Sequence, residues 1–492
     1  MICIAEVVMK AAMKTISYRS YGYRALLAGL LMAIAGNAMA QAQPNVSNPM
    51  PQSVTPPLSL KPRTTFPKTH TVSPVRHFDN DKLRIGNELD LLIKEAIAQN
   101  PDLAAARSNL VAAMARVPVA AMPPDPQIGF RLKDMPTTFS WTRENATEKQ
   151  VVVQQQYPFP GKLNLRKEIQ GKLADITREQ LHAITLHLIT QVRSAFADLF
   201  LVDKSVELAM EQGAMLRDLN EIATEKYKLG PGLQQDILDA DVALARTDAT
   251  LAEFARKRMS REIQLATLLN RDRVSLPPMG VLPDAGLKHS PLELEQIAIE
   301  MNPDILARQH DVQREQLSLS LARRGMLPDM SFQLEYGDRQ DNLLTGTAGK
   351  RNFRPDMLGA VVLFSAPVFY YWKQNEQVIE AEANLARSRF QLAATREQTV
   401  GSLRDQVARL SQHEQVALSL KEQVIPLAQT ALASAMSAYQ VGKVDFVTLL
   451  TAQGKLDEFK NLYWQNEAER FKDLALIDED TGAALTEFGW TQ

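Results

Sequence analysis

The sequence predicts a mainly α-helical fold with a small β part, built from two equivalent halves. Four landmarks of the first half return in the same order about 200 residues later, a distance too long for the repeat unit of a solenoid. Long stretches of helical period carry almost no proline, and short runs of alternating apolar and polar residues lie between them. The landmark pairs are Asn100-Pro101-Asp102 and Asn302-Pro303-Asp304, Pro124-Asp125 and Pro328-Asp329, Tyr157-Pro158-Phe159-Pro160 and Ala366-Pro367-Val368-Phe369, and Tyr227-Lys228-Leu229-Gly230 and Tyr439-Gln440-Val441-Gly442.

Residues 1–40 have the pattern of a secretory signal peptide. Basic residues precede an apolar run over 25–35, and the segment ends in Ala38-Met39-Ala40, a small-x-small cleavage site. The run is shorter than the roughly 20 residues of a transmembrane helix, so we expect cleavage before Gln41 rather than a membrane anchor. The single cysteine, Cys3, lies in this segment, so the mature chain is expected to form no disulfide and no thiolate metal site.

Residues 41–82 are predicted to be a linker, because eight prolines lie between positions 44 and 74 among Ser, Thr and Gln. Loss of the signal segment, with four basic residues and one acidic residue, changes the formal net charge from −2 to −5. No basic block remains to neutralise phosphates, so nucleic acid is not an expected partner. No later segment has the roughly 18 apolar residues of a membrane helix, so any membrane contact is expected to be made by strands.

The first structural repeat is predicted over 83–270 and is dominated by one long helix. No proline occurs between Gly161 and Gly230, and apolar residues recur there at intervals of three and four, as in a coiled coil. A helix over 163–229 would be about 100 Å long at about 1.5 Å per residue. The residues of this seam are Leu181, Ile184, Leu188, Val192, Ala195, Leu199, Val202 and Val206.

The second structural repeat is predicted over 291–480, with a long helix over 373–440 that Pro426 could kink. A helix of this length needs partners of matching length, so each long helix is expected to pack against two shorter helices stacked end to end. An inter-repeat segment over 271–290 and a C-terminal tail over 481–492 complete the organisation. The shorter helices are expected at 88–117 and 233–269 in the first half and at 291–325 and 444–477 in the second.

Each repeat also has two strand candidates. Residues 330–337 alternate Met, Phe, Leu and Tyr with Ser, Gln, Glu and Gly, and residues 127–133 alternate in the same way, so both have one apolar face. Residues 151–157 and 358–364 alternate less regularly. Four strands cannot close a barrel and an open edge cannot lie in lipid, whereas three chains would supply twelve strands. The alternative is a four-stranded sheet that caps a periplasmic helical body.

The order of short helix, strand, strand, long helix, Tyr-x-x-Gly turn and short helix, present twice, resembles the TolC-type outer-membrane efflux family from about Leu83 to Asp480. The resemblance implies a homotrimer in which long-helix coiled-coil hairpins form an α-barrel through the periplasm. It also implies that four strands per chain contribute to a twelve-stranded transmembrane β-barrel in outer-membrane lipid of a Gram-negative bacterium. A periplasmic adaptor protein and an inner-membrane RND pump are the implied partners of this tripartite efflux system.

The resemblance implies a passive exit duct, and Pro158-Phe159-Pro160-Gly161-Lys162 looks most similar to the heavy-metal branch of the family. Heavy-metal cations are therefore the expected cargo, with a multidrug or type I protein-secretion channel as the alternative. A soluble periplasmic coiled-coil scaffold without a pore is the alternative from another class. Glu179-x-x-His182 has the spacing of half a di-iron site but no second copy, and no phosphate loop is found. We therefore expect no enzyme activity, cofactor or resident metal.

Candidate functional residues lie at the two turns where the long helices must reverse. Glycine can adopt the left-handed conformation that ends a helix, so Gly230 and Gly442 are either simple caps or parts of a binding tip. In the family these turns meet the adaptor, so Tyr227, Gly230, Tyr439 and Gly442 are the docking candidates. For the tyrosines, packing in a helix seam is the alternative.

Carboxylates just past each turn would form acidic rings if three chains surround one axis, and such rings attract cations. The family often has acidic residues six and nine positions after the second turn glycine, where this chain has threonines. For any single carboxylate, a solvated surface position is the alternative. The candidates for an entrance constriction are Asp236, Asp239, Asp445, Thr448 and Thr451.

Overall fold

The computed structural model describes five stretches of the chain, in which helices predominate and six strands form two sheets. The signal peptide expected at 1–40 and the linker expected at 41–82 lie outside the described residues. Among the described helices, none combines the length and the hydropathy that crossing a membrane requires. The described residues are 87–141, 146–277, 282–339, 354–485 and 487–489.

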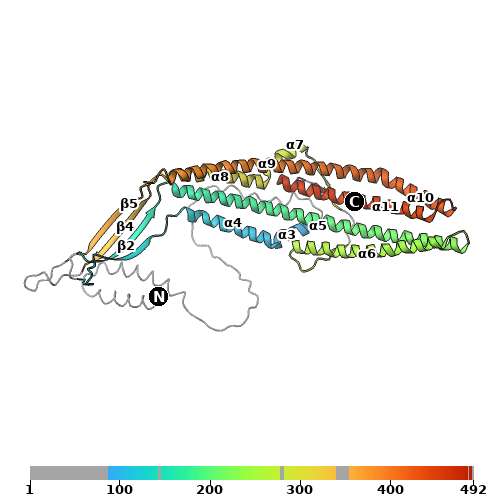
Figure 1. The fold of residues 1–492 in the computed structure, drawn as a ribbon, viewed down its shortest axis with the longest axis horizontal. Helices are drawn as coiled ribbons and strands as arrows, with labels where there is room; N and C mark the ends of the chain where they lie inside the picture. The colour runs from blue at the N-terminus through green and yellow to red at the C-terminus, as the bar shows by residue number, and fades with distance from the viewer. Residues whose placement is uncertain (1–86, 142–145, 278–281, 340–353, 486, 490–492) are drawn as a thin grey trace, which may run out of the picture. The chain divides into compact units, whose positions relative to one another are not determined.

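The long helix of the first repeat is α5, Lys162–Lys228, whose 67 residues span about 100 Å at about 1.5 Å per residue. Helices α4 (Pro101–Ala120) and α6 (Gln234–Leu268) both pack along it, α4 beside its first half and α6 beside its second half (Figure 1). The prediction of one long helix with shorter helices along both of its halves is therefore confirmed in this repeat.

The long helix of the second repeat is interrupted near Pro426. Helix α9 (Gln374–Ser419) passes through a π-helical turn, Leu420–Val424, into α10 (Ile425–Gln440). Proline has no N–H to donate to the carbonyl four residues earlier, and a wider turn before it accommodates that missing bond. The disturbance expected at Pro426 is present, but it takes the form of a π turn that precedes the proline.

The single helices expected over 88–117 and 291–325 are wrong, because each is two helices. Asn100 and Asn302 have extended backbones, with ψ of 125° and 124°, and each side chain accepts hydrogen bonds from the two N–H groups that follow the proline. An asparagine N-cap followed by proline starts a new helix and ends the one before it. The four helices are α3 (Asn87–Gln99), α4, α7 (Pro291–Met301) and α8 (Pro303–Arg324).

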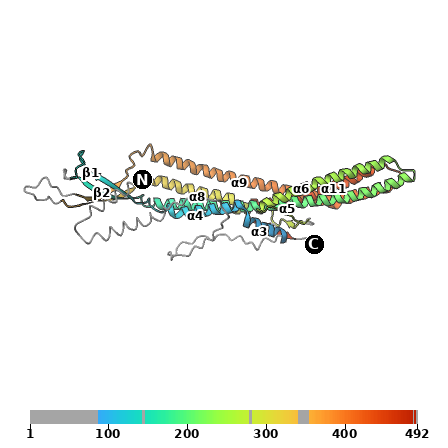
Figure 2. The ribbon, with the colours of Figure 1, turned by 90° about the horizontal axis from the view of Figure 1, so that it is seen from below.

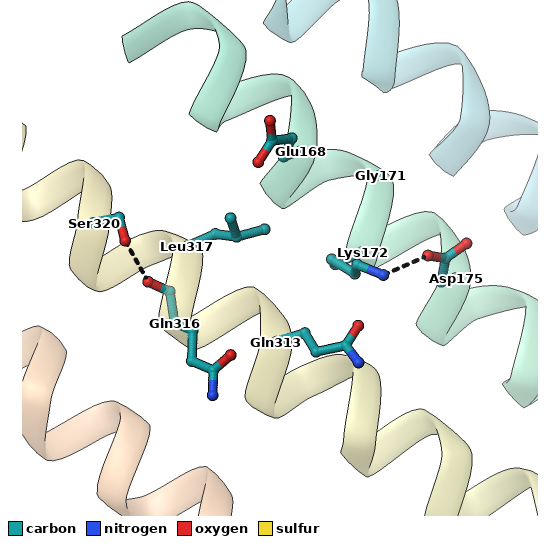
Figure 3. Close-up of a pocket in the computed structure, with 8 residues that line it drawn as sticks. All are labelled: Glu168, Gly171, Lys172, Asp175, Gln313, Gln316, Leu317 and Ser320. Carbon is teal, nitrogen blue, oxygen red and sulfur yellow. Dashed lines mark hydrogen bonds and ion pairs between the residues drawn. The ribbon is translucent and has the colours of Figure 1, made fainter. Parts of the chain in front are cut away.

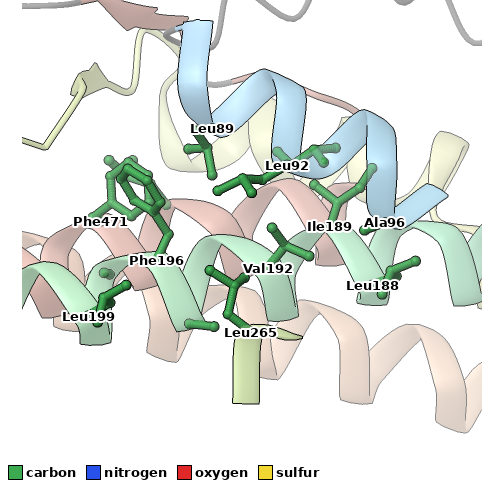
Figure 4. Close-up of a cluster of buried hydrophobic side chains, with 14 of the residues drawn as sticks. Leu89, Leu92, Ala96, Leu188, Ile189, Val192, Phe196, Leu199, Leu265 and Phe471 are labelled. Carbon is green, nitrogen blue, oxygen red and sulfur yellow. The ribbon is translucent and has the colours of Figure 1, made fainter. Parts of the chain in front are cut away.

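The predicted coiled-coil seam of α5 is buried only in its middle. Leu188, Val192 and Leu199 are buried there because α3, α6 and α11 (Phe446–Thr481) all pack on this part of α5, whereas Ile184 is exposed. Helix α11 also packs along α9. Figure 2 shows α8 running beside α9 in the part of the molecule nearer the large sheet. Figure 4 shows the resulting core, with Leu89 and Leu92 from α3, Leu265 from α6 and Phe471 from α11.

All four predicted strands are present, and they form one antiparallel sheet in the order β1-β2-β4-β5. The strands are β1 (Gln127–Lys133), β2 (Glu148–Tyr157), β4 (Met330–Asp338) and β5 (Met357–Phe364). Pairing of β2 with β4 joins the two repeats at the centre of the sheet, so β1 and β5 are its edges.

A second sheet was not predicted. Strand β3 (Asp284–Gly286) pairs with β6 (Glu487–Gly489), which brings the expected inter-repeat segment beside the expected C-terminal tail. Strands of three residues are too short to show an alternating pattern, so the sequence carries no periodic signal for them.

Candidate functional site

The register of the large sheet collects the alternating apolar residues of all four strands on one face. Val151 of β2 lies opposite Phe130 of β1 and Tyr336 of β4, and Tyr336 lies opposite Leu358 of β5, so their side chains share a face. Soluble monomers rarely expose an apolar patch larger than a few hundred Å². We call it the apolar sheet face; its exposed members are Ile128, Phe130, Leu132, Val151, Val153, Tyr157, Phe332, Leu334, Tyr336, Leu358, Val362 and Phe364.

On β1, β2 and β4 the opposite face of the sheet is mostly polar, and several of its charges are paired. Strand β5 also places three exposed apolar residues there: Met357, Val361 and Leu363. Arg131 of β1 donates a hydrogen bond to Glu335 of β4 at 3.2 Å, across the intervening strand. Arg339, just past β4, donates to the buried carboxylate of Glu148, with an Nε–Oε1 distance of 2.7 Å. The two faces thus have opposite chemistry, as in a sheet that separates an apolar phase from water.

The Pro-Phe-Pro-Gly-Lys motif connects this sheet to α5. The ammonium of Lys162 is buried and donates to Leu327 O at 2.9 Å and to Asp329 Oδ1 at 2.8 Å, and the Phe159 N–H donates to the same carboxylate at 2.7 Å. Gly161 has a φ of +90°, which glycine adopts without strain. The contacts described for this motif hold the strands against the helix. This structural role is enough to explain the motif, so the motif by itself does not indicate a cargo.

Helix α5 places the sheet at one of its ends and the α5–α6 turn at the other, and the α10–α11 turn lies beside that second end (Figure 1). Gly230 and Gly442 occupy these turns with φ of +98° and +72°. Their N–H groups donate to the carbonyls of Tyr227 and Tyr439 at 3.1 and 3.0 Å. Both glycines therefore act as helix caps, whatever else they contact.

The two tyrosines of the repeated turn have different surroundings. Tyr227 is 48% exposed, whereas Tyr439 is only 2% exposed and packs on Phe446, with ring centroids 5.4 Å apart. The Tyr439 hydroxyl donates to Asp236 Oδ2 at 2.9 Å, and burial, with this carboxylate beside it, raises the pKa of the hydroxyl. The Lys226 ammonium lies 4.0 Å from the Tyr439 ring centroid and donates to the Tyr439 carbonyl.

These contacts join the two repeats at what we call the tip, the α5–α6 and α10–α11 turns with their packed ends. Lys226 and Asp236 come from the first repeat, and Tyr439 comes from the second. Lys226 was not among the residues predicted from the sequence. Its only sequence signal is a basic residue in the last turn of a helix, which is common because it complements the helix dipole.

The remaining candidates for the entrance constriction lie near the tip, and their described hydrogen bonds are to residues close in sequence. Asp445 caps α11 by accepting the Thr448 N–H at 2.9 Å, and its hydrogen bonds to Thr448 lower the pKa of the carboxyl. Thr451 donates to the carbonyl of Val447 within the same helix at 2.8 Å. Asp239 is half-buried. The structure thus brings Asp236 together with Tyr439, and Asp445 with Thr448.

A separate hollow lies between α5 and α8, with a volume of about 540 Å³ (Figure 3). Lys172 and Asp175 of α5 form an ion pair at 3.4 Å on one side, and Gln313 and Gln316 of α8 lie on the other. Within the described residues, no group of three His, Cys, Asp or Glu side chains could hold a metal ion. Among the described residues, this hollow therefore offers no cluster of metal ligands of that kind.

A sheet with an exposed apolar face, carried at one end of long paired helices, is typical of a membrane-associated channel protein. The model of the outer membrane efflux protein family matches residues 92–271 and 294–477, one match in each repeat. The chain therefore belongs to the outer membrane efflux protein family. Its members are channels of the outer membrane, so the soluble periplasmic scaffold is not supported.

Individual relatives agree with this assignment. The cobalt-zinc-cadmium resistance protein CzcC of Cupriavidus metallidurans is 22% identical over 398 residues, which cover 80% of this chain and 90% of the relative. The structure of CusC has a TM-score of 0.67 at 16% identity, covering 81% of this chain and 92% of that one. The outer membrane protein VceC of Vibrio cholerae has a TM-score of 0.66 at 18% identity, covering 80% and 96%.

Proposed function

We propose that this protein is one third of a trimeric outer-membrane channel, the passive exit duct of a tripartite efflux system for heavy-metal cations. The observation that carries the proposal is the apolar sheet face, which is exposed in the single chain and backed by a polar face. An apolar surface of this kind is stable against lipid, and a polar surface behind it suits a water-filled path.

Two open margins support assembly of three chains. Strands β1 and β5 are the edges of the sheet, and α4 and α9 are the margins of the helical layer, in which contacts run from α4 through α5 and α8 to α9. Unpaired backbone groups cannot stay exposed in lipid, so β5 of one chain is expected to pair with β1 of the next. Three copies would close a ring of twelve strands. Exposed apolar side chains on the margins, such as Val111 of α4 and Phe390 of α9, would be covered by the same contact.

The tip is the proposed docking site for a periplasmic adaptor protein, which would couple the channel to an inner-membrane RND pump. It lies at the opposite end of α5 from the sheet, so a sheet in the outer membrane directs the tip into the periplasm over a distance of about 100 Å. Tyr227 offers an exposed ring beside Gly230 and Leu229, and Gly442 and Val441 are exposed on the second turn. Tyr439 contributes through packing, because its side chain is buried.

The tip is also the proposed gate. A wider opening requires the α5–α6 and α10–α11 hairpins to move apart, and that movement breaks the Tyr439–Asp236 hydrogen bond and the Lys226 contacts. Repacking of helix pairs between two arrangements is a common form of conformational switch. Asp236, Asp239, Asp445, Thr448 and Thr451 would then line or brace the entrance, where three copies of each carboxylate would favour cations.

The cargo proposal rests on the resistance function in the name of the relative from Cupriavidus metallidurans and on the cation preference of such an entrance. A deletion strain should lose tolerance to cobalt, zinc, cadmium, copper or silver and regain it when the gene is restored. Unchanged metal tolerance with raised sensitivity to drugs or dyes would favour the multidrug alternative instead.

The channel itself is tested by a matched pair of substitutions at the middle of β4. Leu334 lies on the apolar sheet face, and its neighbour Gln333 lies on the polar face and hydrogen-bonds to Glu335. A lysine facing lipid at mid-depth costs about 2–4 kcal/mol. Leu334→Lys should therefore abolish heat-resistant trimers and bilayer conductance, while Gln333→Lys should retain both. Equal behaviour of the two variants would contradict lipid contact by this face.

A further inference from the structure

Charged side chains on the polar side of the large sheet are gathered in one part of it. Within the described strands, they lie between the middle of the sheet and the end farther from the helices, and β5 contributes none. The part nearer the helices carries neutral polar residues on β1, β2 and β4, such as Gln154, Gln333 and Ser331. We call the charged group the charged belt; its members are Arg131, Lys133, Glu148, Glu335 and Arg339.

One half of the charged belt is centred on Glu335 of β4. Its carboxylate accepts hydrogen bonds from Arg131 of β1, at 3.2 Å across the intervening strand, and from Gln333 of its own strand. On β5 the opposite position is Gly359, so no side chain at that position competes for the carboxylate. Hydrogen bonds between charged groups are stronger than those between neutral groups. Glu335 therefore holds Arg131 and offsets its charge.

The other half of the charged belt is centred on Glu148 of β2, whose side chain is 2% exposed. Its carboxylate accepts a hydrogen bond from Arg339 Nε at 2.7 Å and another from Gln150 Nε2 at 2.8 Å, and Lys133 lies opposite it in the register of β1. A Cβ atom at Gly337 would come within 2.8 Å of Glu148 Oε2. The missing side chain at position 337 therefore leaves room for this carboxylate over β4.

The charged belt as a whole is cationic. Its three basic and two acidic side chains give a formal charge of +1 per chain, and three chains around one axis would give +3. Asp356 does not offset this charge, because it accepts a hydrogen bond at 2.6 Å from Tyr336, which lies on the apolar sheet face. Asp338 is two residues beyond Tyr336 and shares that face. In a pore, rings of basic side chains favour anions and rings of carboxylates favour cations.

We propose that the charged belt is an ion-selectivity site at the exit of the channel, and that Glu335 limits its preference for anions by neutralising Arg131. This inference rests on the proposed function, because only a closed trimer of strands encloses the polar side of the sheet as a lumen. Loss of the Glu335 carboxylate would raise the formal charge of the belt from +3 to +6 in a trimer, and loss of the Arg131 guanidinium would lower it to zero. The two members of one ion pair therefore have opposite effects on selectivity.

Zero-current potentials of purified trimers in planar bilayers test the charged belt. Glu335→Gln and Arg131→Gln are compared in a KCl gradient around about 0.1 M, where charges act over a Debye length of about 10 Å. All channels carry Tyr439→Phe, which removes the hydrogen bond to Asp236 and so lessens the share of the tip in the selectivity. We expect the ratio of potassium to chloride permeability to fall about threefold in Glu335→Gln and to rise about threefold in Arg131→Gln.

Two further variants serve as controls. The double variant Arg131→Gln/Glu335→Gln restores the formal charge of the belt, so it should return the ratio to its starting value. Asp356→Asn removes one carboxylate from the opposite face of the sheet and should leave the ratio unchanged. In about 1 M KCl, where the Debye length is about 3 Å, the shifts in both single variants should become small.

Conducting trimers whose ratio is the same in Glu335→Gln, in Arg131→Gln and in their parent would overturn the role of the belt and leave the channel proposal intact. Equal shifts in Asp356→Asn and Glu335→Gln would also overturn it, because the effect would then not depend on the face of the sheet. If Glu335→Gln forms no trimers, Arg131→Gln decides alone, by a raised or an unchanged ratio. Absence of any conductance from the wild-type protein would overturn the proposed channel and this inference with it.

Discussion

Removal of the Tyr439 hydroxyl should favour the open form of the channel. Tyr439→Phe keeps the buried ring and its packing on Phe446, so the substitution removes only the hydrogen bond to Asp236. Hydrogen bonds to a charged group contribute about 1.5–3 kcal/mol. Because the Asp236 carboxylate is only half-buried, we take the lower end of this range. A change of about 1.4 kcal/mol shifts the ratio of open to closed tips about tenfold for each chain.

Planar bilayer recordings measure this shift directly as the fraction of time that single trimers conduct. Tyr227→Phe is the matched control, because Tyr227 holds the equivalent position in the first repeat and is half exposed. We expect Tyr439→Phe to raise the conducting fraction and Tyr227→Phe to leave it unchanged. Identical recordings from wild type and Tyr439→Phe, with trimers of normal stability, would falsify the assignment of this bond to the gate.

Three further predictions concern stability, measured by thermal unfolding in detergent. Burial raises the pKa of the Asp457 carboxyl from 3.8 to about 6, so the protonated carboxyl stabilises the folded protein below about pH 4, and this stabilisation is lost as the pH rises through about 6. Asp457→Asn should therefore stabilise the protein by about 1–2 kcal/mol at pH 8 and not at pH 4. Equal effects at the two pH values would contradict this assignment. Arg193 and Asp478 form a buried ion pair at 2.7 Å, so Asp478→Ala should cost about 3–5 kcal/mol, and a loss below about 1 kcal/mol would argue against an uncompensated buried charge. Gly442→Ala should destabilise the protein by about 1–2 kcal/mol, because Gly442 has a φ of +72°. Gly454 lies in the middle of α11 and is exposed, so Gly454→Ala should stabilise the protein by about 1 kcal/mol. Effects of the same sign for the two substitutions would refute this reasoning.

Local pattern predicted those elements whose cause is local. The absence of proline and the three-four spacing of apolar residues are enough for α5, and alternation is enough for β1 and β4. The helix breaks at Asn100 and Asn302 could also be predicted from neighbouring residues, because an asparagine before a proline is a start signal for a helix. The apolar period continues across both positions, which is why a single helix is the natural but mistaken prediction.

The candidate site was harder to predict from the sequence, because its main contacts join residues that are far apart in the chain. Tyr227 and Tyr439 occupy the same motif, and their sequence neighbours do not explain why one is exposed and the other is buried. The difference arises from tertiary packing, in which Lys226 and Asp236 of the first repeat surround Tyr439 of the second.

The pairing of β2 with β4 has a consequence for how the protein reaches its folded state. This pairing, and the shared core of Leu219 and Leu432 at the tip, join residues about 200 positions apart, so neither repeat completes its structure from its own residues. Contacts of such sequence separation are slow to form, because closing the intervening loop costs entropy before any contact compensates for it. A chain that emerges with its N-terminus first must therefore keep the edge of β2 and its apolar side chains unpaired until the second repeat arrives. During that interval, the half-made protein is vulnerable to aggregation and to proteolysis, and chaperones that hold unfolded chains would shorten its exposure.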